Sequence, residues 1–219
     1  MPYQYGYKRY SRKKGLNLTL LLIIINVAVF IAVLILQATL GEGVFNLIAV
    51  TPSAILAGKN LWTIITNMFV HANFLHLFVN MLSLFFLGSF LERLIGKKRY
   101  ILIYFISGIV ASLFFVFLAG SSMQNIPAVG ASGAIFGLAG VLALITPKLP
   151  VYIMFIPIPI PLWIGVVGIL VIMWAISLLA GLPIGNTAHL GGLLAGAAYG
   201  LFLRTKHKRK IQVLDKMFR

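Results

Sequence analysis

Six apolar segments, separated by short polar or basic links, constrain the fold of this chain more than any other feature. A helix needs about 20 apolar residues to cross the roughly 30 Å hydrocarbon core of a bilayer, because each residue adds about 1.5 Å. We therefore predict six membrane-spanning helices, the fourth of them unusually short. Their ranges are residues 18–37, 74–91, 100–118, 132–146, 162–179 and 187–203.

The composition supports a membrane location. Of the 219 residues, 61% are hydrophobic and 10% are charged, which is far more apolar than an average soluble domain. We predict an all-α polytopic membrane protein: a six-transmembrane-helix bundle over residues 18–204, with basic cytoplasmic tails at 1–17 and 205–219. The first apolar run is too long for a signal-peptide core, so we expect it to be retained.

Lys and Arg residues alternate between the two sides of the predicted bundle. Five lie in the first tail, four follow the second span and seven lie in the last tail, but one or none lies in each other link. By the positive-inside rule, we expect a multi-pass protein of the cell membrane with both termini in the cytoplasm. Because these charges already serve orientation, we do not expect a nucleic-acid partner. In the last tail, Ile211, Leu214 and Phe218 share a helical face, which predicts a segment resting on the anionic inner leaflet.

Two links differ from simple turns. Residues 39–72 are largely apolar but interrupted by polar residues, which predicts a first loop of short helices embedded in the interface, with Trp62 at headgroup level. After the fourth span, a series of prolines that ends at Pro161 predicts an extended link. Residues 119–130 are expected to form a loop.

Three chemically capable side chains are predicted to share one layer of the bundle. Spans two, four and six all start at the outer side. At about 1.5 Å per residue, His76, Ser132 and His189 lie about 26, 24 and 23 Å above the inner ends of their helices. This layer is a few ångströms below the outer surface, and residues placed for unrelated reasons would not be expected to agree in depth.

Ser132 has two interpretations. Gly133, Gly137 and Gly140 form a small-residue stripe, so the serine could merely allow two membrane helices to approach. Alternatively, this stripe packs against the glycines that follow His189, and the imidazole activates the hydroxyl as a general base. The alternative that His189 is a structural histidine, hydrogen-bonded to a backbone carbonyl, remains open. An ionisable group inside a span is nevertheless a candidate functional residue.

His76 and Asn80 are four residues apart and share one helical face. Both could donate hydrogen bonds to a developing oxyanion, or they could serve as polar contacts between helices. A metal site is disfavoured, because His71 and His76 would lie about 140° apart on a helix, with no carboxylate or thiolate beside them. The chain has no cysteine, and we expect no cofactor.

The few acidic residues limit the catalytic options. Asp215 is the only aspartate, which excludes an intramembrane aspartate pair. Glu92 and Asp215 lie toward the inner side, and Glu42 lies in the outer loop near the first span. A Ser-His dyad is therefore favoured over a Ser-His-Asp triad.

The chain resembles the rhomboid family of intramembrane serine proteases over residues 18–204. The resemblance is carried by three motifs in the same order and topology: His76-Leu77-Phe78-Val79-Asn80, Gly130-Ala131-Ser132-Gly133 and Ala188-His189-Leu190-Gly191-Gly192. It implies Ser132 as nucleophile and His189 as base, with the Ser132 N–H, His76 and Asn80 holding the oxyanion. Supporting positions are Gly130, Gly133, Phe136 and Gly192.

The resemblance also has a departure. Thr63 follows Trp62 where many members have Arg, which puts the usual anchoring of the first loop in doubt. Glu92, Arg93 and Gly96 resemble the inner end of the family's second span.

From the site we expect hydrolysis of a peptide bond in or just outside a transmembrane segment, with membrane-protein substrates and the lipid bilayer as partners. Lateral entry of the substrate between spans two and five is implied by the resemblance. The first alternative is a catalytically silent rhomboid-like scaffold, although such a protein should lack the serine or the histidine. The second is a small transporter or channel, but the chain has no repeated half and its polar residues gather at one end.

Overall fold

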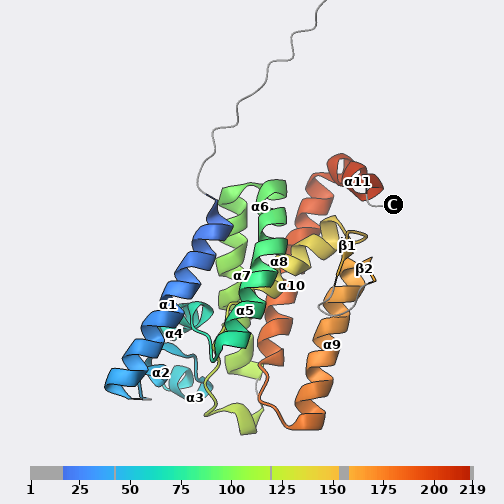
Figure 1. The fold of residues 1–219 in the computed structure, drawn as a ribbon. Helices are drawn as coiled ribbons and strands as arrows, with labels where there is room; N and C mark the ends of the chain where they lie inside the picture. Colours follow the sequence, from blue (N-terminus) through green and yellow to red (C-terminus); the bar gives the residue numbers. More distant parts are fainter. Residues whose placement is uncertain (1–16, 42, 119, 153–157, 218–219) are drawn as a thin grey trace, which may run out of the picture.

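The computed structural model describes residues 17–41, 43–118, 120–152 and 158–217, with side chains as far as residue 214. Long helices run side by side, with α1 at one edge of the bundle and α9 at the other (Figure 1). The helices are α1 (Leu18–Leu40), α2 (Gly43–Ile48), α3 (Pro52–Leu56), α4 (Thr63–Thr66), α5 (Phe74–Ser83), α6 (Ser89–Ile95), α7 (Lys97–Leu118), α8 (Ser132–Ile145), α9 (Leu162–Ala180), α10 (Asn186–Lys206) and α11 (Lys208–Met217).

Each predicted span is helical, which confirms the all-α polytopic membrane fold. Within the described residues, four helices are long and apolar enough to cross a bilayer: residues 18–40, 74–95, 97–118 and 162–180. The second of these joins α5 to α6 through one π-helical turn, η2 (Leu84–Gly88). The two other predicted spans correspond to α8, which has 14 residues, and α10, which has 21.

Helix α8 lies inside the bundle and packs against α7, α9 and α10. All but three of its 14 residues are buried, so the helix has almost no lipid-facing surface. At about 1.5 Å per residue it is about 21 Å long, shorter than the hydrocarbon core. The helix is therefore too short to reach both surfaces of that core.

Glycines let α8 and α10 approach until their backbones touch, as the predicted stripes require. A Cβ placed on Gly192 would overlap the carbonyl oxygen of Gly133, and one on Gly196 would overlap that of Gly137. Further along, a Cβ on Gly200 would lie 3.0 Å from the Val141 carbonyl oxygen. Close backbone approach of this kind is how membrane helices gain packing energy without a hydrophobic driving force.

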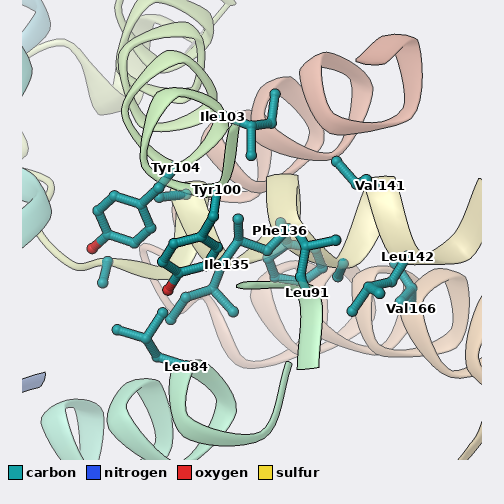
Figure 2. Close-up of a cluster of buried hydrophobic side chains, with 14 of the residues drawn as sticks. Leu84, Leu91, Tyr100, Ile103, Tyr104, Ile135, Phe136, Val141, Leu142 and Val166 are labelled. Carbon is teal, nitrogen blue, oxygen red and sulfur yellow. The ribbon is translucent and has the colours of Figure 1, made fainter. Parts of the chain in front are cut away.

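The main core surrounds this helix pair. Figure 2 shows Tyr100 and Tyr104 of α7 beside Ile135 of α8, with Leu84 of the π-helical turn close by. Tyr100, Tyr104 and Leu84 are fully buried. Large apolar side chains on the outer helices are instead exposed, as expected of surfaces that face lipid.

Glu92 ties the inner end of α6 to the start of α1. Its carboxylate accepts hydrogen bonds from the Leu18 N–H (3.0 Å), the Thr19 N–H (2.9 Å) and the Thr19 hydroxyl (2.8 Å). The first N–H groups of a helix lack intrahelical partners, and the helix dipole favours a negative charge there. Glu92 thus caps the first turn of α1 from another helix, which holds α1 against the bundle.

The first loop contains short helices, as predicted: α2, α3, α4 and the 3₁₀ turn η1 (Asn67–Phe69). The indole N–H of Trp62 donates to the Leu47 carbonyl at 2.8 Å, and the Trp62 ring is exposed. Thr63 is fully buried, and its hydroxyl donates to the Asn60 carbonyl at 2.7 Å. The loop is also joined to α7, where the Asn67 amide donates to the Ser112 hydroxyl at 3.0 Å.

The other two predicted links are largely extended or turn-like. The outer link contains the 3₁₀ turn η3 (Ser121–Met123) and pairs Ala128 with Val50 of the first loop through two backbone hydrogen bonds. After α8, the strands β1 (Pro150–Val151) and β2 (Ile160–Pro161) pair in antiparallel register, in agreement with the extended link that the prolines predict. Residues 153–157 lie outside the described part.

The C-terminal helix α11 corrects one expectation. Ile211 does not face the membrane but is buried against the main core, because α11 folds back onto the inner ends of α8 and α10. Leu214 is half-buried. Phe218, the third residue of the predicted apolar face, lies outside the described residues.

Replacing Glu92 with Ala is expected to weaken the attachment of α1. The change removes three hydrogen bonds and leaves buried donors without a partner, so we expect the free energy of unfolding to fall by about 3 kcal/mol. Thermal unfolding in detergent measures this. Thr39→Ala is the control, because the Thr39 hydroxyl is exposed and bonds only to carbonyls of α1. Equal melting temperatures for the two variants would contradict the capping role.

Gly196→Ala is expected to separate α8 from α10, because the new methyl group meets a backbone carbonyl that cannot rotate away. We expect a destabilisation of about 2 kcal/mol or more. Gly168→Ala on α9 is the matched control, since a Cβ there meets nothing within 4 Å. The control should be neutral or stabilising by up to about 1 kcal/mol, because alanine favours helix. Unfolding curves of the two variants that coincide would refute this account of the helix contact.

Candidate active site

Ser132 is the first residue of α8, and the segment before it is held from two sides. The Gly130 N–H donates to the Asn67 carbonyl of the first loop at 2.9 Å. Gly130 itself has φ +123°, a conformation that L side chains rarely adopt, and a Cβ there would lie 2.8 Å from the His76 ring. Glycine is therefore required at this position both by the backbone and by the neighbouring imidazole.

The Ser132 hydroxyl and the His189 imidazole are in hydrogen-bonding contact. The distance between Ser132 Oγ and His189 Nε2 is 2.8 Å. His189 lies in the first turn of α10 and is 6% exposed. The glycine contacts between α8 and α10 bring these two residues together although they are 57 positions apart in the chain. A histidine in this position can accept the serine proton.

Phe136, one turn after Ser132, fixes the plane of the imidazole. Its ring stacks on that of His189 with centroids 4.8 Å apart and planes 27° apart. The other ring nitrogen, His189 Nδ1, is buried and has no hydrogen-bond partner among the described residues. Among the described residues no carboxylate bonds to His189, so the observed contact is a Ser-His pair.

His76 and Asn80 line the same cavity as Ser132 and His189, so the predicted grouping of these four residues is found. The Asn80 amide donates to the His76 carbonyl of its own helix at 2.8 Å. Among the described residues Asn80 makes no hydrogen bond to another helix, which argues against a role as polar glue between helices. Its remaining N–H and the His76 ring are available to a ligand.

His71 lies beside the His76 ring but outside α5, in the first loop where the predicted range of residues 39–72 puts it. The angle of about 140° between His71 and His76 assumed that both are helical, but Asn73 caps α5 by accepting from the His76 N–H at 2.9 Å. His71 lies in the preceding loop, and its ring contacts that of His76 edge-on at 5.2 Å. The cap residue Asn73, which precedes an apolar run, is the signal in the sequence for this helix boundary.

His71 is 2% exposed, and both its ring nitrogens lack a hydrogen-bond partner among the described residues. Its contact with His76 limits how far the His76 ring can turn. Within the described part of the chain, no three histidine or acidic side chains are grouped so that they could hold a metal ion.

The four polar residues face a cavity of about 600 Å³. Its walls are mostly apolar and include Val166, Ile169 and Met173 of α9 opposite residues of α5. A pocket of this size with a few convergent polar groups is typical of a ligand or substrate site. Its chemistry suits attack on a carbonyl: a hydroxyl beside a proton acceptor, with N–H donors nearby.

Comparisons with known proteins show similarity to rhomboid proteins over most of the chain. The family model of the rhomboid domain matches residues 58–206. The Rhomboid protease AarA of Providencia stuartii is 31% identical over 90% of this chain and 76% of its own length. The Rhomboid protease GluP of Bacillus subtilis is 32% identical over 68% of this chain. The Inactive RHOMBOID-like protein 8 of Arabidopsis thaliana is 39% identical over 40% of this chain. The chain spans 28% of the length of GluP and 24% of that of the inactive relative.

Phe136→Leu tests whether the stacked ring orients His189. The smaller, non-planar side chain leaves the imidazole free to tilt, so we expect a fluorophosphonate probe to label Ser132 at least about tenfold more slowly. Mass spectrometry of the labelled peptide measures the rate. Phe117→Leu on the exposed part of α7 is the control and should label at the unaltered rate. Unchanged labelling of Phe136→Leu would exclude the orienting role.

Proposed function

The chain belongs to the rhomboid family, and we propose that it is an intramembrane serine endopeptidase with Ser132 as nucleophile and His189 as general base. The observation that carries the proposal is the 2.8 Å contact between Ser132 Oγ and His189 Nε2, which faces a cavity within a membrane-spanning bundle. A serine hydroxyl is a weak nucleophile until a base accepts its proton. Here that base is within direct reach.

The reaction follows from the positions of the donors and acceptors. As Ser132 Oγ attacks the carbonyl carbon of the scissile bond, its proton passes to His189 Nε2. The negative charge that develops on the carbonyl oxygen is stabilised by the Ser132 N–H and by the His76 and Asn80 side chains. His189 then gives its proton to the leaving amine, and the acyl-enzyme forms on Ser132. A water molecule, deprotonated by His189, completes the hydrolysis and releases the serine.

The substrate is proposed to be a transmembrane segment of another membrane protein. The short helix α8 sets Ser132 below the membrane surface, where a segment that unwinds locally could present an extended bond. The cavity lies between α5 and α9, which suits entry of a substrate helix from the lipid. We further propose that the protein resides in the cell membrane with both termini in the cytoplasm, because the basic residues gather at one end.

A catalytically silent rhomboid-like scaffold is the second candidate. It is favoured by one observation, the similarity of 87 residues to a relative whose name describes it as inactive. The scaffold needs the cavity but not the contact between Ser132 and His189. A transporter or channel is less well supported, because the polar residues of the cavity gather at one end of the bundle.

Cleavage of a labelled transmembrane substrate in liposomes separates these functions. We expect Ser132→Ala and His189→Ala to lose cleavage by at least about 1,000-fold, because each removes a group that takes part in bond formation. Ser122→Ala in the exposed turn η3 is the control and should cleave as the unaltered protein does. Substrate binding without cleavage by the unaltered protein would favour the scaffold. Cleavage by Ser132→Ala at the unaltered rate would remove Ser132 from the mechanism.

A further inference from the structure

A second concavity lies at the other end of the α8–α10 pair. It has a volume of about 110 Å³ and lies where the last turn of α8, the last turn of α10 and the first turns of α11 meet. Two cationic side chains, one amide and three apolar side chains line it: Arg204, Lys208, Gln212, Leu144, Pro147 and Ile211. At this size it is well below the roughly 300–1,000 Å³ of a typical small-molecule site, but it can receive a small polar group.

The docking of α11 creates this pocket. Ile211 is buried against the main core and holds α11 onto the bundle, and Lys208 and Gln212 lie next to it on the same side of the helix. Arg204 donates from Nη1 to the Leu144 carbonyl at 3.2 Å, which fixes its guanidinium at the rim. Arg204 is thus held by a hydrogen bond although its side chain is exposed, and Lys208 is exposed beside it.

Among the described residues, the lining of the pocket carries no carboxylate. Within the described residues, neither Arg204 nor Lys208 forms an ion pair with a carboxylate. Glu92, the one acidic residue whose side chain is described, is already bonded to the start of α1. The pocket also borders the first turn of α11, whose unpaired N–H groups favour an anion.

The location of the pocket indicates which kind of anion it would bind. The pocket is at the same end of the bundle as α6 and the start of α1, where basic residues gather (Figure 1). Leu144, Pro147 and Ile211 form an apolar wall that continues into the bundle core. A ligand that joins a phosphate to apolar chains matches both the basic side chains and the apolar wall of the pocket. Basic pockets between helices at the cytoplasmic side of membrane proteins are suited to anionic headgroups.

We propose that this pocket binds the phosphate headgroup of an anionic phospholipid. The phosphate oxygens would accept hydrogen bonds from the Arg204 guanidinium, the Lys208 ammonium and the Gln212 amide, while the acyl chains extend along the outside of the bundle. Such a lipid would join the inner ends of α8 and α10, whose outer ends carry Ser132 and His189. The proposal does not depend on the proposed protease activity.

Native mass spectrometry of the full chain in detergent tests the site. Phosphatidylglycerol, phosphatidylcholine and inorganic phosphate are titrated separately against the unaltered protein, against Arg204→Gln with Lys208→Gln, and against Arg209→Gln with Lys210→Gln. The second pair is the matched control: it removes two charges from exposed neighbours that do not line the pocket. Thermal unfolding without lipid verifies that both double variants are folded. If the first does not fold, Lys208→Gln alone replaces it, with Lys210→Gln as its control.

We expect one molecule of phosphatidylglycerol to bind the unaltered protein and the control with affinities within about threefold. The pocket variant should bind it about 25-fold more weakly, at about fivefold for each charge removed. An equal loss in both double variants would overturn the proposal, because it would mean that only the diffuse positive charge attracts the lipid. Equal binding of phosphatidylcholine would also overturn it. Binding of inorganic phosphate as tight as that of the lipid would identify a soluble-anion site instead.

Discussion

The backbone contact between α8 and α10 is the interaction on which the candidate active site depends. Within lipid there is no hydrophobic gain when two apolar helices meet, so their association rests on close packing. Gly192 and Gly196 leave room for the carbonyl groups of Gly133 and Gly137, and no larger residue could do so. The 2.8 Å contact between Ser132 and His189 follows from this approach. The small residues are therefore needed for the packing, and the same packing places the Ser132 hydroxyl beside the His189 imidazole.

Polar groups at the edges of the bundle hold this central pair in register. Buried N–H and C=O groups need internal partners where water is absent. Asn67 illustrates the effect: its carbonyl accepts from the Gly130 N–H, and its amide donates to Ser112 of α7. The first loop is thereby connected both to α7 and to the turn that precedes Ser132. Thr63 occupies the position where many family members have an arginine, which raised the question of how this loop is anchored. The Asn67 amide connects the loop to α7, whereas the Thr63 hydroxyl bonds to Asn60 within the loop itself.

The helices and the grouping of the site residues could be predicted from the sequence because both depend on regular geometry. Apolar length indicates a span, and the rise per residue gives the depth of His76, Ser132 and His189. His71 was expected in the first loop, where it lies, but its contact with the His76 ring could not be predicted, because it depends on the path of the loop before Asn73. The contacts of Glu92 with Leu18 and Thr19 and the burial of Ile211 could not be derived either. Each depends on how separate helices dock, which the periodicity of one helix does not determine.

The length of α8 links the two ends of the molecule. A helix of about 21 Å cannot reach both surfaces of a hydrocarbon core of about 30 Å, so at each end other segments must cover it. At the Ser132 end, the cavity between α5 and α9 occupies the missing length. At the Leu144 end, α11 folds back and Ile211 closes over the core. A span that reached both surfaces would need neither arrangement. The cavity at Ser132 and the basic pocket beside Arg204 thus lie at the two ends of one short helix that is enclosed by protein.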